Sequence, residues 1–124
     1  MSSGNAMIVE DEKDLCYLLV NLLRKENMCA SCVNSLSEAK VNINNIKPNV
    51  LFLDNHLPDG SGADFISQVK TSYPSTKVIM ITAHDSPWDI ENAFRKGADY
   101  FISKPFNVVT IKNMLKMLAV GNTG

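Results

Sequence analysis

Short apolar runs alternate along this chain with segments in which apolar residues recur at every third or fourth position. Short continuous apolar runs are typical of buried strands, and the spacing of three and four is typical of one face of a helix. The predicted strands are Ala6–Val9, Met28–Val33, Val50–Leu53, Lys77–Ile81 and Tyr100–Ile102. The predicted helices are Leu15–Lys25, Ser35–Pro48, Phe65–Tyr73, Ser86–Gly97 and Ile111–Leu118.

Two of the helix starts carry capping signals. Ser35 is followed three residues later by Glu38, which is the spacing of a capping box. Ser86 is followed by Pro87 and Asp89, a pattern typical of an N-cap with proline at the first helical position. Both signals agree with the starts that the apolar spacing predicts.

The alternation of strands and helices predicts an α/β fold. Val50–Leu53 is apolar at every position, which indicates a strand covered on both faces, as in a parallel sheet. We therefore expect a three-layer, doubly wound fold in which helices lie on both faces of a five-stranded parallel sheet. In such sheets ligands bind beyond the carboxyl ends of the strands.

Composition and length bound the domain organisation. The chain has 124 residues, 45% of them hydrophobic and 20% charged, as in a single globular domain. Its net charge of -1 argues against binding to nucleic acid through a basic surface. We expect residues 1–6 to be an expression scar, residues 7–120 to form the domain, and residues 121–124 to be a tail or the start of a linker. Neither a secretory signal nor a membrane-spanning run of about 20 apolar residues is evident.

The three cysteines predict a reducing compartment, because an odd number does not fit a disulfide framework. A cytoplasmic location is the corresponding expectation. Cys29 and Cys32 form a CxxC motif, but the motif lies within a predicted strand and a second pair of zinc ligands is lacking. We therefore expect buried small side chains there rather than a redox or metal site.

Polar residues follow the predicted strands at the edge where a ligand would bind. Glu10 and Asp11 follow the first strand and Asp54 the third. Thr82 and Lys104 follow the fourth and fifth strands. Each residue alone is also typical of a helix cap or a solvated position. Three carboxylates in one place repel one another unless a cation is present, so the set predicts a divalent metal.

Oxygen ligands of this kind suit Mg²⁺, which binds one or two carboxylates together with a phosphate. Phosphate chemistry follows, because an aspartate can accept a phosphoryl group while a metal and a lysine offset the charge. Asp54 is the best-placed nucleophile, since it follows the central apolar strand. Lys104 supplies a fixed positive charge, and the Thr82 hydroxyl can donate to a phosphoryl oxygen.

Four ordered motifs carry a resemblance to a known family, the receiver domains of two-component response regulators. The motifs are Ile8–Glu12, Leu51–Asp54 with Leu57–Gly62, Ile79–Ala83, and Gly97–Phe106. The similarity extends from Met7 to about Leu118. It implies a (βα)5 flavodoxin-like fold with strand order 2-1-3-4-5.

The resemblance also implies roles for individual residues. Asp54 matches the phosphoacceptor, which takes a phosphoryl group from a histidine kinase or a phosphotransfer protein, and Lys104 matches the phosphate-binding lysine. The implied ligands of Mg²⁺ are Asp11, Asp54 and the backbone carbonyl of His56, with Glu10 as an outer acid. Thr82 and Phe101 match the switch pair, and the bond from Lys104 to Pro105 is typically cis in this family.

Two positions depart from the family pattern. Glu10 stands where an aspartate is more common, and its extra methylene group either crowds the metal or lets the carboxylate reach the metal directly. Phe101 lacks the hydroxyl of a tyrosine, so packing alone must hold its inward state.

The usual output face comprises the fourth helix, fifth strand and fifth helix, and homodimerisation through it is plausible on symmetry grounds. The segment at Lys104–Phe106 is similar to receivers of NtrC-like transcription activators, and stand-alone regulators and receivers of hybrid kinases fit nearly as well.

Two histidines flank the phosphoacceptor in sequence. His56 and His84 lie two residues after Asp54 and Thr82. One interpretation is that they tune dephosphorylation by blocking or orienting the attacking water, and the other is that they are loop histidines without a role.

We also expect Trp88, at the start of the fourth helix, to be exposed near an interaction surface.

Two other functions remain as alternatives. The first is a receiver-like interaction module that signals without phosphorylation. The second is an aspartate-based phosphatase of the haloacid dehalogenase type, which the order of the motifs disfavours because its acidic pair follows the lysine. Apart from self-phosphorylation and self-dephosphorylation, the sequence predicts no enzyme.

Overall fold

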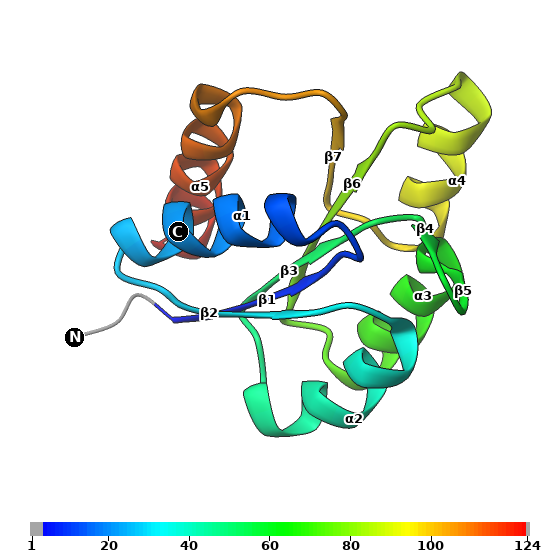
Figure 1. Ribbon diagram of the computed structural model, residues 1–124, viewed down its shortest axis with the longest axis horizontal. Helices are drawn as coiled ribbons and strands as arrows, with labels where there is room; N and C mark the ends of the chain where they lie inside the picture. Colours follow the sequence, from blue (N-terminus) through cyan, green and yellow to red (C-terminus); the bar gives the residue numbers. More distant parts are fainter. Residues whose placement is uncertain (1–3, 124) are drawn as a thin grey trace.

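The computed structural model describes residues 4–123, which form a five-stranded parallel sheet with helices on both sides (Figure 1). The order across the sheet is β2-β1-β3-β6-β7. Its strands are β1 (Asn5–Val9), β2 (Cys29–Val33), β3 (Val50–Leu53), β6 (Lys77–Thr82) and β7 (Tyr100–Ser103). A two-stranded hairpin of β4 (His56–Leu57) and β5 (Gly60–Ser61) follows β3. The main sheet therefore confirms the predicted order, 2-1-3-4-5 when the hairpin is left out of the count.

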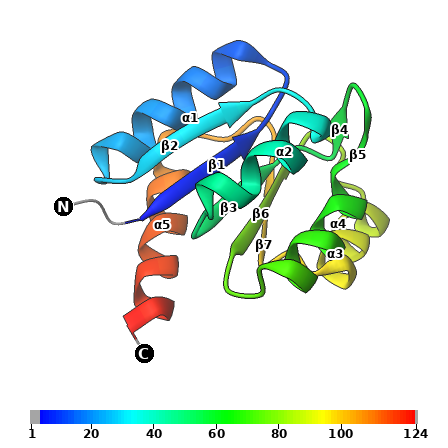
Figure 2. The ribbon, with the colours of Figure 1, turned by 90° about the horizontal axis from the view of Figure 1, so that it is seen from below.

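Five helices cover the two faces of the sheet. They are α1 (Lys13–Lys25), α2 (Leu36–Ile46), α3 (Gly62–Ser72), α4 (Pro87–Lys96) and α5 (Val108–Thr123). Figure 2 shows α1 and α5 together on one side of the strands, and α2, α3 and α4 on the other. This three-layer arrangement confirms the predicted α/β class.

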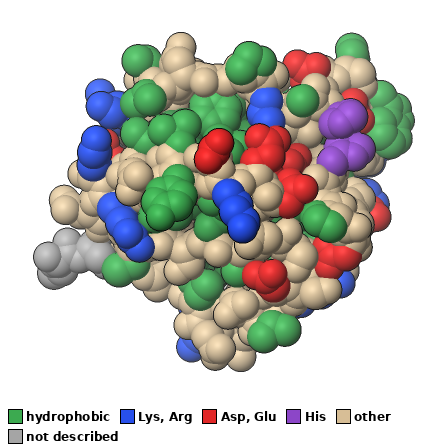
Figure 3. Space-filling model, in the orientation of Figure 1, with side chains coloured by type: hydrophobic (Ala, Val, Ile, Leu, Met, Phe, Trp, Pro, Cys, Tyr) green, Lys and Arg blue, Asp and Glu red, His purple; other side chains and the backbone are tan. Residues whose placement is uncertain are grey.

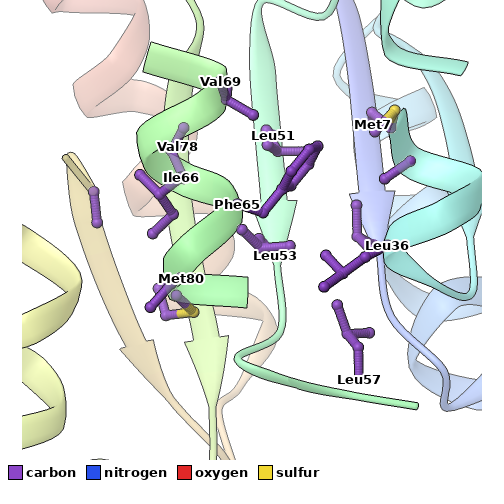
Figure 4. Close-up of a cluster of buried hydrophobic side chains, with 14 of the residues drawn as sticks. Met7, Leu36, Leu51, Leu53, Leu57, Phe65, Ile66, Val69, Val78 and Met80 are labelled. Carbon is purple, nitrogen blue, oxygen red and sulfur yellow. The ribbon is translucent and has the colours of Figure 1, made fainter. Parts of the chain in front are cut away.

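The core is split by the sheet into two apolar layers. Met7, Leu51 and Met80 point toward α2 and α3, where they meet Phe65 and Ile66 (Figure 4). The alternate strand residues point to the other face and pack against α1 and α5. The largest of these are Ile8, Phe52, Ile79, Ile81 and Ile102, with Leu19, Leu23 and Ile111 opposite. Because both faces of the three central strands are covered, β1, β3 and β6 are apolar at successive positions, as the sequence pattern indicated.

The predicted helix caps are present. The Ser35 hydroxyl accepts from the Glu38 amide at 3.2 Å. Ser86 and Asp89 form a reciprocal capping box at the start of α4. A further anchor comes from the hairpin, where the Asp59 carboxylate accepts from the Leu36 amide at 2.8 Å. Hydrogen bonds from the Ser37 hydroxyl and from the Leu36 and Ser37 amides lower the Asp59 pKa to about 2, and they tie the hairpin to the first turn of α2.

Several details differ from the sequence expectations. The first strand begins at Asn5, one residue before the predicted start at Ala6. Phe94, which the helical spacing places on the inner face of α4, is 46% exposed. Trp88 is exposed as predicted. The helix α5 spans Val108–Thr123 and so extends beyond the predicted helix Ile111–Leu118 at both ends.

The cysteines differ most from the expectation. Cys16 of α1 and Cys32 of β2 form a disulfide, whereas the cysteine count predicts free thiols. Cys29 is exposed rather than buried. Cysteine pairing depends on the crossing of α1 over β2, which counting residues does not reveal.

Among residues 4–123, no helix combines the length and the apolar character that crossing a membrane requires.

Gly62 lies at the closest approach of α3 to the end of β3. Its amide donates to the Asn55 carbonyl at 2.9 Å. A Cβ at this position would collide with the Asp54 carbonyl oxygen and would lie 3.1 Å from the Asn55 Cα. The backbone cannot shift to accommodate a side chain at Gly62 without moving Asp54.

We expect Gly62→Ala to lower the free energy of unfolding by about 1–3 kcal/mol, because the added methyl group overpacks this contact. Urea unfolding measures the change. Gln68→Ala, at an exposed position of the same helix, is the control and should stay within about 0.5 kcal/mol of the wild type. Equal stability of the two variants would show that the contact is not tight.

Candidate functional site

Polar side chains from four strands meet at the carboxyl edge of the sheet. Glu10 and Asp54 directly follow β1 and β3, which are neighbours in the sheet. Thr82 ends β6, and Lys104 directly follows β7. Since β2 and β3 lie on opposite sides of β1, this edge includes the point at which the strand order reverses. Such a point is where doubly wound sheets bind ligands.

Three carboxylates form the centre of the site. Glu10, Asp11 and Asp54 each offer an oxygen, and these oxygens all lie within 4.8 Å of one another. Glu10 and Asp54 are buried, with exposed fractions of 2% and 6%, and Asp11 is exposed. Two buried acids so close together are unfavourable unless positive charge offsets them.

Lys104 supplies part of that positive charge. Its Nζ lies 2.9 Å from Glu10 Oε1, 3.2 Å from Asp54 Oδ2 and 3.2 Å from Glu12 Oε1. Glu12, the third acid in the run from Glu10, lies outside the set of site residues that the sequence predicts. Its contact with Lys104 joins positions 92 residues apart, so only the fold reveals it.

Backbone amides fix the buried carboxylates. The Glu12 amide donates to Glu10 Oε2 at 3.1 Å, and the His56 amide donates to Asp54 Oδ1 at 3.2 Å. Both donors lie two residues after their acceptors, in the turns that leave the strands. The acids are therefore oriented by local loop geometry as well as by Lys104.

Burial determines the protonation of Glu10. Burial, reinforced by the charge of Asp54, raises the pKa of Glu10 from 4.5 to about 7, although Lys104 and the Glu12 amide oppose the change. Burial also disfavours the charged form of Lys104. The hydrogen bond to Glu10 and the charges of Asp54 and Glu10 outweigh that effect and raise the Lys104 pKa. Lys104 therefore stays cationic.

The donor set fits a hard divalent cation. Three carboxylates against one contacting ammonium leave negative charge in excess, and all the available ligand atoms are oxygens. Mg²⁺ prefers such ligands and keeps part of its water shell, which the exposed Asp11 allows. The residues could also present the Asp54 carboxylate to a phosphoryl group beside Lys104.

Thr82 and Phe101 lie on adjacent strands near the site. Thr82 is 1% exposed, and its Oγ1 accepts from the His84 amide at 3.2 Å. Phe101 pairs in register with Met80, is partly buried and packs against the layer beneath α3 and α4. Met80 and Thr82 share a strand face, so Thr82 and Phe101 lie on the same side of the sheet.

His56 and His84 form a contact that the sequence does not reveal. Their ring centroids are 3.6 Å apart, with a tilt of 36° between the rings. Figure 3 shows the two rings touching at the surface, beside a group of acidic side chains. The contact joins the loop after β3 to the loop after β6. The Lys104–Pro105 peptide bond, at the third loop of the site, is cis.

The comparisons with known proteins point to one family. Residues 6–116 match the family model described as the response regulator receiver domain. PilR, a response regulator protein of Pseudomonas aeruginosa, is 30% identical over 115 residues, which are 93% of this chain and 26% of PilR. RegX3, a sensory transduction protein of Mycobacterium tuberculosis, is 36% identical over 103 residues, covering 83% of this chain and 45% of RegX3. The chain thus spans a quarter to a half of these relatives.

The structural comparison agrees. The beryllofluoride-activated NtrC4 receiver domain, described as a dimer in solution, superposes with a TM-score of 0.86 at 32% sequence identity. The match covers 92% of this chain and 94% of that one.

The raised pKa of Glu10 predicts a pH dependence of stability. Between about pH 4.5 and pH 7 the folded protein keeps a proton on Glu10 that the unfolded chain has released. The contribution of this proton to the free energy of unfolding is therefore complete below pH 4.5 and is lost as the pH rises through 7. Glu10→Gln should remove this loss and raise the free energy of unfolding at pH 8 by up to about 3 kcal/mol.

Urea unfolding at pH 5 and pH 8, in buffer without divalent cations, measures the difference. Glu26→Gln changes an exposed carboxyl and serves as the control. Parallel pH profiles for the wild type and Glu10→Gln would contradict the assignment.

Proposed function

Because the chain belongs to the response regulator receiver domain family, we propose that it is a Mg²⁺-dependent phosphoacceptor switch in which Asp54 takes a phosphoryl group from a histidine kinase. Receiver domains are signalling domains rather than conventional enzymes. The observation that carries the proposal is the setting of Asp54. It is a buried carboxylate at the sheet edge, 3.2 Å from the Lys104 ammonium and beside two further acids.

Asp11, Asp54 and the backbone carbonyl of His56 would hold Mg²⁺, with Glu10 as an outer acid. When bound, the ion would offset the charge of the carboxylates and of the phosphoryl oxygens. Asp54 then attacks phosphorus, so that a new oxygen–phosphorus bond forms as the nitrogen–phosphorus bond of phosphohistidine breaks. The departing imidazole keeps the electron pair of the broken bond.

Lys104 and Thr82 act on the oxygens of the transferred group. Lys104 already contacts Asp54, and its positive charge stabilises the negative charge that accumulates there. The Thr82 hydroxyl donates to a phosphoryl oxygen once it turns from its present position. That movement frees space on the side of the sheet that it shares with Phe101, and the ring turns inward to fill it. New charge at Asp54 thereby shifts the population between two packings.

The signal would pass to partners through α4, β7 and α5. Support comes from the exposed apolar residues Trp88 and Phe94 on α4 and Val109 on α5. We propose that this face relays phosphorylation to an output domain or a second copy of the chain. Relatives such as RegX3 and PilR extend beyond the matched region, and we propose that residues 7–120 form the receiver domain of a larger regulator. Transcription regulation in the cytoplasm is the proposed context, with no direct contact of this domain with nucleic acid.

The contact of His56 with His84 supports a role for these side chains in dephosphorylation. The two exposed rings meet between the loops that follow Asp54 and Thr82. We infer that the pair restricts the approach of water from that side. Of blocking and orienting the attacking water, the stacked geometry favours blocking, because each ring is packed against the other.

Phosphorylation by acetyl phosphate tests the proposed function. With Mg²⁺, the wild type should gain the mass of one phosphoryl group, and Asp54→Asn should gain none because the nucleophile is lost. Intact-mass spectrometry gives the result. Asp64→Asn removes an exposed carboxylate from α3 and should be phosphorylated like the wild type.

An unmodified wild type would favour the interaction module that signals without phosphate. Continued turnover of a small phosphomonoester would favour a phosphatase.

The histidine pair predicts a non-additive effect on the lifetime of phosphoaspartate. His56→Ala and His84→Ala should each shorten the lifetime severalfold, because either change opens the stacked pair to water. The double variant should be little faster than the single variants, since both remove one shared barrier. The decay of the phosphorylated mass after removal of acetyl phosphate measures the three rates. Unchanged lifetimes would leave these histidines without a role.

A further inference from the structure

A disulfide lies directly behind the acidic loop of the proposed metal site. Cys16 in the first turns of α1 and Cys32 near the end of β2 are joined, with their Cα atoms 5.9 Å apart. This Cα separation is within the range at which a disulfide closes without movement of the backbone. Nothing in the proposed phosphoryl chemistry uses these sulfurs.

We propose that Cys16 and Cys32 form a reversible redox site, oxidised by low-molecular-weight disulfides, whose state sets the order of the acidic segment Glu10–Glu12. The part of this proposal that concerns Mg²⁺ rests on the proposed function. The formation of the disulfide and its effect on the loop do not.

Backbone contacts place the two cysteines on either side of the acidic segment. The Cys16 amide donates to the Glu12 carbonyl at 3.1 Å. The Glu10 amide donates to the carbonyl of Val33, the residue next to Cys32, at 3.0 Å. A covalent link from Cys16 to Cys32 therefore closes a ring around Glu10 and Glu12. The link fixes both ends of the segment that carries the acids.

The sulfurs also surround the Glu10 carbonyl oxygen. Cys16 Sγ lies 3.3 Å from it and Cys32 Sγ lies 4.0 Å from it. Asn34 Nδ2 donates to the same oxygen at 2.9 Å. In the dithiol state the thiol hydrogens can donate to this carbonyl, whereas in the disulfide state they are absent and the Asn34 donor remains. Oxidation thus changes the hydrogen bonding of the residue whose side chain contacts Lys104.

The exposure of the sulfurs indicates the order of the reaction. Cys16 is buried and Cys32 is half-buried, so Cys32 is the site of entry. Its thiolate attacks the small disulfide, a mixed disulfide forms, and one small thiolate leaves. The Cys16 thiolate then attacks the Cys32 sulfur and expels the second small thiolate. Two protein thiols are oxidised, one small disulfide is reduced, and the two protons pass to the released thiolates.

Packing holds α1 against β2 without the covalent link. Leu19, Leu22 and Leu23 of α1 are buried in the same apolar layer as Met28 and Ala30. The dithiol form therefore keeps the fold, and reduction changes the acidic segment locally. Intracellular disulfides of this reversible kind serve in redox sensing.

Alkylation after treatment with oxidised glutathione tests the site. Because oxidised glutathione also modifies the exposed Cys29, the test uses Cys29→Ser as the background. Oxidised Cys29→Ser should have no reactive cysteine and carry no glutathione, and dithiothreitol should restore two reactive cysteines. In this background, Cys16→Ser should retain one glutathione on Cys32, and Cys32→Ser should not acquire one at the buried Cys16. Two reactive cysteines in glutathione-treated Cys29→Ser under native conditions would overturn the proposal.

Amide hydrogen exchange tests the effect on the loop. The amides of residues 10–16 should exchange severalfold more slowly in the oxidised than in the reduced wild type, without Mg²⁺. Cys29→Ser should show the same difference, and Cys16→Ser should show none in either redox condition. Equal exchange in the two states of the wild type would overturn the coupling.

Calorimetric titration with MgCl₂ extends the test to the metal. The oxidised protein should bind Mg²⁺ severalfold more tightly, because its acidic segment is already ordered. Equal affinities would overturn this link. If neither state binds Mg²⁺, the proposed function fails and the metal link with it, while thiol counts and hydrogen exchange still decide whether the redox site exists and orders the loop.

Discussion

The site depends on one electrostatic constraint, which is the gathering of buried acids around a single contacting ammonium. Glu10 and Asp54 are almost fully buried, and Lys104 lies within 3.2 Å of both. Because the carboxylates outnumber the cation that contacts them, the arrangement is most stable when further positive charge arrives or when Glu10 holds a proton. The same excess of negative charge makes the edge of the sheet receptive to a divalent ion, and so prepares Asp54 for a phosphoryl group.

The sheet makes this gathering possible. Parallel strands deliver their carboxyl ends to one edge, so residues from four separate parts of the chain meet without long loops. The apolar layers on the two faces exclude water from the strands. Asp54 and Thr82, which directly follow Leu53 and Ile81, lie where this apolar interior ends. The position of this boundary explains why Asp54 and Thr82 are buried although they lie at the edge of the sheet.

Much of this arrangement could be predicted from the sequence, because each strand ends where an apolar run meets a polar residue. That signal is local, and it located Glu10, Asp54 and Thr82 without reference to any other part of the chain. Contacts between distant segments gave no such signal. The disulfide requires the crossing of α1 over β2, and the stacking of His56 on His84 requires two loops to converge. Phe94 follows the helical period and is nevertheless exposed, since α4 covers the sheet with little more than Ala93.

The anchoring of the hairpin by Asp59 makes the two sides of the site mechanically unequal. On one side the loop after β3 is fastened to α2 by hydrogen bonds to two successive amides, those of Leu36 and Ser37. On the other side α4 contributes one buried residue, whereas α3 contributes five. A structural change at Asp54 is therefore resisted on the side of α2 and is accommodated more easily on the side of α4. The fold thus favours movement of α4 over movement of the hairpin.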